Sequence, residues 1–431
     1  MGGWTPLGNW DQQSVRTGSE ADRAWKGWED QDMDRYTVIS ADCHAGADLP
    51  DYRPYLEARL HEEFDRWLAD YSNPFRDLNA PEANRNWDSA VRQAALEADG
   101  IVAEVVYPNT VPPFFPASGL VTPTPPADEY ERRLAGLRAH NRWLSDWCAE
   151  LPGRRAGIGQ ILLNDVDDAV YEVNWIADHG LMGGVLLPGV PPGSGIDPLH
   201  SPAYDPVWRA CEERGVVVNV HGGGGSPSEG YFPATLAMFV LEASFYSHRP
   251  VWSLVMSGVF DRFPELRLVV TEAGTKWIPN TLNAMDALQA KQDEGSIGAL
   301  TFIDPFRLGR KPSEYWTTNC WVGASFMTRE DAADRTLVGI DRIMWGSDFP
   351  HEEGTFPHSR ESLGYTYAGV DPREVVLMVG ANAAEVYGFD LDDLAPFAAQ
   401  IGPVVDAVRA GIDRIPETSS LAFETRPASV S

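Results

Sequence analysis

The sequence has few positive charges for its length. Among 431 residues there are 34 Lys and Arg against 63 Asp and Glu, so the formal net charge at pH 7 is −29. Nucleic acids and anionic membrane surfaces attract basic protein faces, and this balance argues against both as partners. The acidic residues are spread along the chain instead of forming one block, which is typical of a solvated surface that aids solubility.

Cysteines and long apolar runs are also scarce. The four cysteines lie far apart and form no C-x-x-C pair, which argues against a disulfide framework or a thiolate zinc knuckle and favours reduced thiols. The first residues lack a basic stretch followed by an apolar one, so we expect no signal peptide. No run approaches ~18 apolar residues, so we expect no transmembrane helix. These absences predict a cytoplasmic protein.

The chain does contain enough apolar material for a large core, with 43% hydrophobic and 11% aromatic residues. Eight short β-branched runs alternate with segments of helical character. Most of these runs are apolar on both faces, as parallel strands covered by helices are. They span residues 36–44, 101–109, 155–164, 183–190, 216–222, 267–274, 315–323 and 342–351.

This alternation predicts a (β/α)8 TIM barrel, with an open doubly wound sheet as the alternative. Helices are expected at residues 167–180, 205–214, 236–263, 277–294 and 325–337. Residues 45–100 and 110–154 are too long for simple crossovers. They follow the C-terminal ends of strands, where barrels place their active sites, so we expect them to roof the pocket. Surface elaboration without a ligand role is the other interpretation.

We therefore expect a barrel over residues 36–390, preceded by an extension at 1–35 and followed by a C-terminal helix and tail at 391–431. The extension holds four Trp residues, which suits an arm that docks on the barrel or on a partner subunit, although disorder is an alternative. Either this arm or residues 110–154 could join subunits, and we expect a homo-oligomer.

Residues that bind metals occur where the predicted strands end. Asp42 and His44 end the first strand and are two positions apart, so they share one face. His221 ends the fifth strand, Glu272 the sixth and Asp348 the eighth. A lone His at a strand end is more often structural, but several such groups on one barrel mouth match the ligands of Zn²⁺ or another divalent transition ion.

These residues lie in motifs that together resemble the amidohydrolase superfamily. The motifs are ADCH, VNVHGG, GVFDRFPELRLVVTEAGTKWIP, MWGSDFPH and GANAAEVYGF. Within it, the chain is most similar to the branch of aminocarboxymuconate-semialdehyde decarboxylase and the resorcylate decarboxylases. The resemblance implies one divalent metal held by Asp42, His44, His221 and Asp348. Zn²⁺ is favoured by affinity, with Mn²⁺ or Fe²⁺ as alternatives.

Two positions bear on the type of metal centre. Binuclear relatives use a Lys on the fourth strand, but residues 183–190 contain none, which indicates a mononuclear site. Decarboxylases of the branch carry a His where this chain has Glu272. A carboxylate beside a dication should stay ionised, and it could accept a proton, orient a water or bind the metal. A structural salt bridge between Glu272 and an Arg is the alternative.

Other candidates follow the strand ends. His248 is a candidate for assisting proton transfer, although a surface position suits it equally. Lys276 and Trp277 could supply a cation and an aromatic wall to the substrate pocket. His351 and its neighbour Glu352 could support Asp348, since ligating groups usually have such partners. Two candidates for gripping a substrate carboxylate are Arg53 and Arg59.

The leading functional hypothesis is metal-assisted hydrolysis of a small cyclic or aromatic substrate. A metal-bound water would attack, Asp348 would take its proton, and Glu272 or His248 would assist. Aromatic residues near the end of the second strand, such as Tyr107, suit a flat substrate. The alternatives are non-oxidative decarboxylation of an aromatic or enoic acid and, from another class, an inactive barrel that acts as a binding protein.

Overall fold

The computed structural model describes residues 34–116, 124–227, 230, 232–297, 300–301 and 307–424. Eight parallel strands form one sheet in the order β1-β2-β3-β4-β5-β6-β9-β10. Backbone hydrogen bonds join its two ends, because Asp348 N donates to Asp42 O at 2.8 Å and His44 N donates to Phe349 O at 2.6 Å. The predicted (β/α)8 barrel is therefore confirmed, and the open doubly wound sheet is wrong.

All eight predicted barrel strands are present, most of them shorter than their apolar runs. They are β1 Ile39–Ala45, β2 Ala103–Pro108, β3 Arg155–Gln160, β4 Gly184–Leu186, β5 Val218–His221, β6 Leu268–Thr271, β9 Cys320–Ser325 and β10 Ile343–Gly346. Two further two-residue strands, β7 Ser296–Ile297 and β8 Leu300–Thr301, form a separate antiparallel pair.

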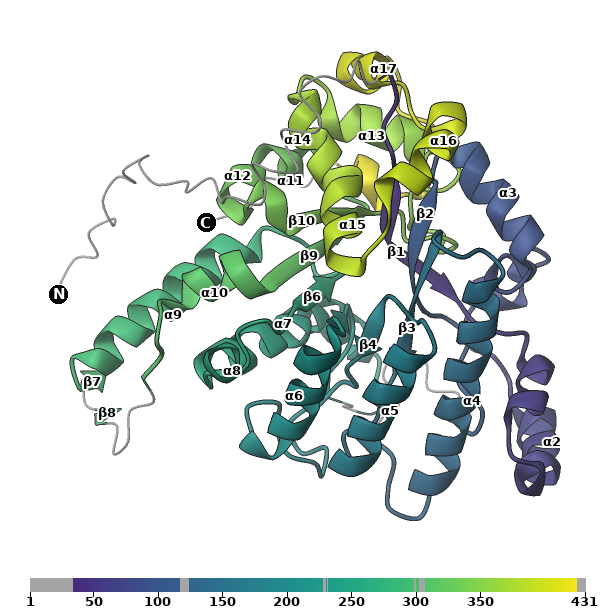
Figure 1. The fold of residues 1–431 in the computed structure, drawn as a ribbon, viewed down its shortest axis with the longest axis vertical. Coiled ribbons are helices and arrows are strands. Elements are labelled where there is room, and N and C mark those ends of the chain that lie inside the picture. The colour runs from purple at the N-terminus through teal and green to yellow at the C-terminus, as the bar shows by residue number, and fades with distance from the viewer. Residues whose placement is uncertain are drawn as a thin grey trace. The chain divides into compact units, whose positions relative to one another are not determined.

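The helices between the strands cover the barrel from outside. Figure 1 shows α4 (Tyr130–Ala149), α5 (Val166–Asp178) and α6 (Asp205–Arg214) side by side along β3, β4 and β5. Local sequence sets their ends: the Asp165 side chain accepts hydrogen bonds from the first backbone amides of α5. Gly215 ends α6 in the left-handed conformation, with φ of 64°.

The remaining α-helices lie outside the strands as well. They are α2 His61–Asp70, α3 Ser89–Asp99, α7 Thr235–Met256, α8 Val259–Arg262, α9 Trp277–Asp293, α10 Pro312–Asn319, α11 Arg329–Ala333, α12 Arg335–Val338, α13 Ser359–Tyr367, α14 Pro372–Val376, α15 Asn382–Tyr387, α16 Leu391–Ile401 and α17 Val405–Ala410. None of the helices in the described ranges is long and apolar enough to cross a membrane.

The seventh predicted strand and the helix after it needed correction. The chain is helical at Pro312–Asn319, because Pro312 starts α10 and Glu314 accepts a hydrogen bond from the Lys311 backbone amide. The strand begins only at Cys320 and extends to Ser325, which we had assigned to a helix. The predicted helix at residues 325–337 is split into α11 and α12.

The barrel interior is packed with side chains and is not a channel. Tyr107 from β2 donates or accepts a hydrogen bond with Thr271 from β6 at 2.8 Å, and Tyr387 from α15 donates to Asn219 of β5 at 2.8 Å. All four side chains are almost fully buried. These hydrogen bonds link β2 to β6 and α15 to β5 inside the barrel.

The segments expected to roof the pocket contain α2, α3 and α4. Residues 117–123, which precede α4, lie outside the described ranges. The expected N-terminal arm falls almost entirely outside them as well, at residues 1–33, and so does the end of the expected C-terminal tail, at 425–431.

Candidate metal centre

Four predicted ligands meet at the mouth of the barrel. Nε2 of His44 lies 3.3 Å from Oδ1 of Asp42 and 3.2 Å from Oδ1 of Asp348. Nε2 of His221 approaches the same Asp42 oxygen at 3.4 Å. Two carboxylates and two imidazoles from β1, β5 and the end of β10 therefore surround one small volume.

A register shift in β1 turns both of its ligands inward. Ile39 and Ala41 belong to the apolar cluster inside the barrel, and Cys43 belongs to the cluster under the helices. The pairing of β1 with β2 shifts between Ser40 and Cys43. Because successive side chains alternate between faces, this irregularity lets Asp42 and His44 follow Ile39 and Ala41 on the inner face.

Each of the four residues keeps a buried polar atom without a hydrogen-bond partner. These atoms are Asp42 Oδ1, His44 Nε2, His221 Nε2 and Asp348 Oδ2. Burying such groups without partners is costly, and buried carboxylates in particular need a cation. The nitrogen and oxygen donors fit a divalent transition ion, so the residues present fit the metal that the sequence implied.

Backbone carbonyls hold both imidazoles in the orientation that a metal requires. Nδ1 of His44 lies 3.2 Å from the carbonyl oxygen of Pro108. Nδ1 of His221 lies 3.2 Å from the carbonyl of Gly222 and 3.3 Å from Oε2 of Glu272. A proton on Nδ1 leaves the Nε2 lone pair directed at the cluster, which is the usual arrangement of metal-binding histidines.

Supporting groups also fix the carboxylates. Ser325, at the end of β9, donates a hydrogen bond to Oδ2 of Asp42. Nδ1 of His351 lies 2.8 Å from Oδ1 of Asp348, and its Nε2 lies 3.2 Å from the side-chain oxygen of Asn109. His351 thus contacts one oxygen of Asp348, and the other oxygen has no hydrogen-bond partner.

Two of the acidic residues adopt a strained backbone. Glu272 and Asp348 have φ values of 53° and 59°, in the left-handed region that residues with side chains avoid. Such strain costs about 1–3 kcal/mol and tends to persist at functional sites. Glu272 directly follows β6 and Asp348 lies two residues after β10, so both strained residues stand where their strands end.

The charged groups of the cluster strongly shift one another's pKa values. Burial alone would raise the pKa of Asp42, but the imidazoles of His221 and His44 hold the pKa of this carboxyl well below its usual range. Burial lowers the pKa of His44, yet hydrogen bonds to Asp348 and Asp42 raise the pKa well above its ordinary value. The carboxylates thus draw positive charge to this point, which is what a bound cation would supply.

Glu272 stands at the edge of this cluster. Burial raises the pKa of its carboxyl to about 7, and the negative charges of Asp348 and Asp42 add to the effect, while His221 opposes it. Among the described residues no Arg forms an ion pair with Glu272, so the structural salt bridge weighed above is not found. The carboxylate instead faces Asp348 and Glu353, with ligand atoms within 4.8 Å of one another.

Some other candidates lie apart from the four ligands. His248 donates or accepts a hydrogen bond with the carbonyl of Ala273 at 2.9 Å and stacks on Trp277 at 3.9 Å. Burial lowers the pKa of His248. Within the described ranges, no ion pair or ring contact joins His248, Trp277 or Lys276 to the cluster. Arg53 pairs with Asp65, and Arg59 with Glu57, at the surface.

Sequence reasoning missed two polar residues of the site. Ser325 escaped because its strand was expected to end at residue 323, although a polar residue at a strand end is the same signal that revealed the ligands. Asn109 lies just beyond β2 and is the last residue of the predicted run 101–109, so the same strand-end signal could have found it; its role shows in its contact with His351.

The barrel and its mouth together define a metal-dependent TIM-barrel enzyme. A family model described as amidohydrolase matches residues 41–389, and the chain belongs to that family. The resemblance drawn from the motifs is therefore confirmed, and the inactive binding barrel is not supported.

Several relatives are named as decarboxylases. The chain is 26% identical over 283 residues to a gamma-resorcylate decarboxylase of Rhodococcus jostii, a match covering 61% of this chain and 79% of the relative. A 5-carboxyvanillate decarboxylase of Sphingomonas paucimobilis has the same fold, with a TM-score of 0.61 at 20% identity, covering 82% of this chain and all of the other.

The corresponding enzyme of Novosphingobium aromaticivorans was solved with manganese and 4-hydroxy-3-methoxy-5-nitrobenzoic acid. It superposes with a TM-score of 0.60 at 17% identity, over 82% of this chain and 96% of that chain. At these identities the solved structures establish the fold alone.

Proposed function

We propose that this protein is a metal-dependent, non-oxidative decarboxylase of a hydroxylated aromatic carboxylic acid. The observation that carries the proposal is a buried cluster of unpartnered ligand atoms in a chain whose curated relative is a gamma-resorcylate decarboxylase. The comparisons favour this reaction over hydrolysis, which the sequence had favoured.

Asp42, His44, His221 and Asp348 would hold one divalent ion. When bound, the ion would supply positive charge that binds substrate oxygens and withdraws electron density from the ring. We had expected Zn²⁺, but a relative of the same fold contains manganese, so Mn²⁺ is the ion to load first. Tyr107 adds an aromatic surface below this point, because its ring centre lies 4.7 Å from that of His221.

Decarboxylation breaks the bond between the ring and its carboxylate. CO₂ leaves, the electron pair stays on the ring carbon, and a proton must replace the lost group. Asp348 and His351 are placed to deliver that proton, because they share a hydrogen bond of 2.8 Å beside the ligand cluster. A proton from solvent can replace the transferred one by way of His351, which is partly exposed.

The direct test supplies the Mn²⁺-loaded full chain with 2,6-dihydroxybenzoate and with 5-carboxyvanillate, and measures CO₂ and the phenolic product. We expect CO₂ in equal amount to product, and Asp348→Asn should lower turnover by about 10² or more. Asp341→Asn removes an acid that lies on the surface and serves as the matched control. Absence of CO₂ from every aromatic acid in the series would refute decarboxylation.

Metal-assisted hydrolysis is the second candidate, and Glu272 is the observation that favours it. Its carboxylate lies 3.3 Å from His221, where it could take a proton from an attacking water. Hydrolysis of an aromatic amide by the same preparation, lost in Glu272→Gln, would support this reaction. If Glu272→Gln still releases CO₂, Glu272 has no part in the chemistry and serves only to orient His221.

A further inference from the structure

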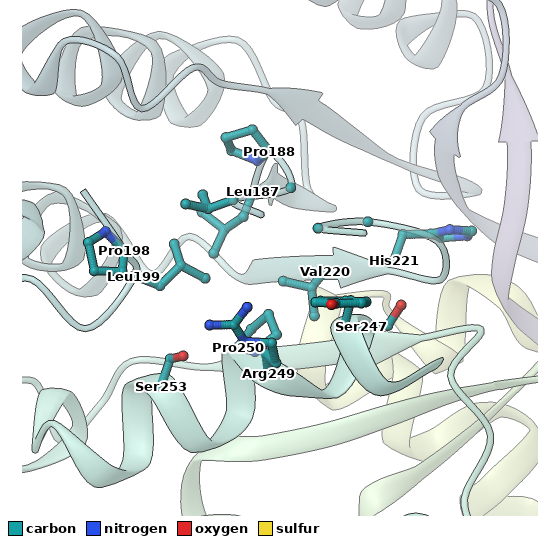
Figure 2. Close-up of a pocket in the computed structure, with 15 residues that line it drawn as sticks. Leu187, Pro188, Pro198, Leu199, Val220, His221, Ser247, Arg249, Pro250 and Ser253 are labelled. Carbon is teal, nitrogen blue, oxygen red and sulfur yellow. The ribbon is translucent and has the colours of Figure 1, made fainter. Parts of the chain in front are cut away.

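A second pocket lies on the outer side of the barrel wall, between the ends of β4 and β5 and helix α7. Its walls are mostly apolar, and Figure 2 shows the side chains of Leu187, Leu199 and Val220 facing its interior. His221 lines one end, so the pocket reaches the strand that carries a metal ligand. The remaining labelled wall residues are Pro188, Pro198, Ser247, Arg249, Pro250 and Ser253.

One charged side chain points into this pocket. Figure 2 shows the guanidinium of Arg249, from α7, between Leu199 and Val220. Arg249 is only partly exposed, and within the described part of the chain no acid forms an ion pair with it and no hydrogen bond is made by its side chain. Its one aromatic contact is the Tyr246 ring, 5.9 Å away.

Arg249 differs in this from two other partly buried arginines of this acidic chain. Arg262 pairs with Asp205 at 2.8 Å, and Arg138 pairs with Asp168 at 3.0 Å. The acid nearest to Arg249 along α7 is Glu242, which is seven positions earlier and exposed. A guanidinium held among apolar walls without an anion is a site that a carboxylate can satisfy with two parallel hydrogen bonds.

The walls of the pocket are built by close backbone packing. A Cβ on Gly189 would lie 2.3 Å from the backbone nitrogen of Gly225, so the two loops touch where only glycine fits. Gly225 has a φ of 80°. From α7, the Ser247 hydroxyl accepts a hydrogen bond from the backbone of Gly223 at 3.1 Å and fixes the loop that follows His221.

We propose that this pocket binds a small organic acid, with its carboxylate on Arg249 and its apolar body against Leu187, Leu199 and Val220. Val220 faces the pocket from the outer side of β5, whereas Nε2 of His221 points to the metal cluster, so His221 lies between the two sites. A bound acid would contact the strand and loop that hold His221 without touching the metal. The proposal requires no particular reaction at the metal centre.

Cyclohexanecarboxylate is a suitable probe, because it has an apolar body and a carboxylate but no ring hydroxyl. Calorimetric titration of the Mn²⁺-loaded chain should show saturable binding. Arg249→Gln should weaken the binding about tenfold or more, and the neutral cyclohexanecarboxamide should bind the native chain more weakly by a similar factor. Arg249→Lys keeps the charge but not the two parallel donors of the guanidinium. Its affinity for cyclohexanecarboxylate should lie between those of the native chain and Arg249→Gln.

His44→Gln is the control for binding at the metal. It should leave the affinity for cyclohexanecarboxylate unchanged, because His44 faces the other side of the barrel wall. Equal melting temperatures and metal contents of the native chain and Arg249→Gln will show that the substitution acts locally. No saturable binding, unchanged affinity in Arg249→Gln, or loss of binding in His44→Gln would each overturn the proposal, and this outcome is independent of whether the enzyme releases CO₂.

Discussion

A buried ion pair beneath the metal centre allows a quantitative test of how the fold supports the site. Arg92 on α3 and Glu104 on β2 are both almost fully buried, and their side chains share hydrogen bonds of 3.0 and 2.6 Å. The same guanidinium donates to the backbone carbonyl of His44 at 2.8 Å. The pair therefore connects the outer layer of helices to the strand that carries two metal ligands.

Replacing Glu104 by Gln keeps the shape but removes the nearest counter-ion of two buried cations, Arg92 and Arg155. Arg155 also approaches Glu104, at 3.5 Å, and is nearly as buried as Arg92. Removing one partner of such a pair typically costs about 3–5 kcal/mol, because the charge left behind has lost its counter-ion in a poorly polarisable interior. We expect Glu104→Gln to lower the free energy of unfolding by about that amount.

The assay is urea denaturation followed by tryptophan fluorescence, with the shift in midpoint converted by a common slope. Arg92→Met and the double variant complete a thermodynamic cycle, and the double variant should lose much less than the sum of the single ones. Asp65→Asn breaks the exposed Arg53–Asp65 pair and should leave the midpoint unchanged. A loss below about 1 kcal/mol in Glu104→Gln would refute the reasoning.

Two further predictions concern stability. Burial lowers the pKa of His140 to about 3, so this ring is neutral in the folded state while it would take up a proton near pH 6.5 after unfolding. The native chain should therefore lose stability relative to His140→Phe as pH falls from about 6.5 toward 3, by about 1.4 kcal/mol per unit. The free energy of unfolding of the native chain and of His140→Phe is measured by urea denaturation at each pH. If the two free energies change in parallel with pH, the prediction is wrong. The exposed His200→Gln serves as the control and should follow the native chain. Gly136→Ala should cost about 1–3 kcal/mol, because its Cβ would lie 1.9 Å from the Pro113 carbonyl oxygen; an unchanged melting temperature would disprove this close packing.

The barrel could be predicted from the sequence because each strand is a short apolar run that a parallel sheet buries on both faces. The main error, at residues 315–323, has a local cause. The run looks like a strand, but Pro312 and the Glu314 cap start a helix just before it, and the helix continues to Asn319. The strand propensity of residues 315–319 is therefore overridden by the helix that starts at Pro312.

The candidate ligands could be found because in a barrel the strand ends converge, whatever their distance along the chain. The residues that surround these ligands could not be predicted in the same way. The contacts of His351 with Asp348 and Asn109 depend on how a loop folds back, and the direction of Asp348 depends on a φ of 59° that no sequence pattern announces. Nothing in the sequence distinguishes Arg249 from the other arginines, because its lack of an acid partner among the described residues follows from the folded structure.

The most direct test of the account is the metal content of the purified chain after loading with Mn²⁺ and removal of free ion. Elemental analysis should find about one ion per native chain, and His221→Gln should retain much less of it, because each ligand contributes to a four-residue shell. The control His200→Gln should bind as the native chain does. Equal retention of metal by His221→Gln and the native chain would contradict the account.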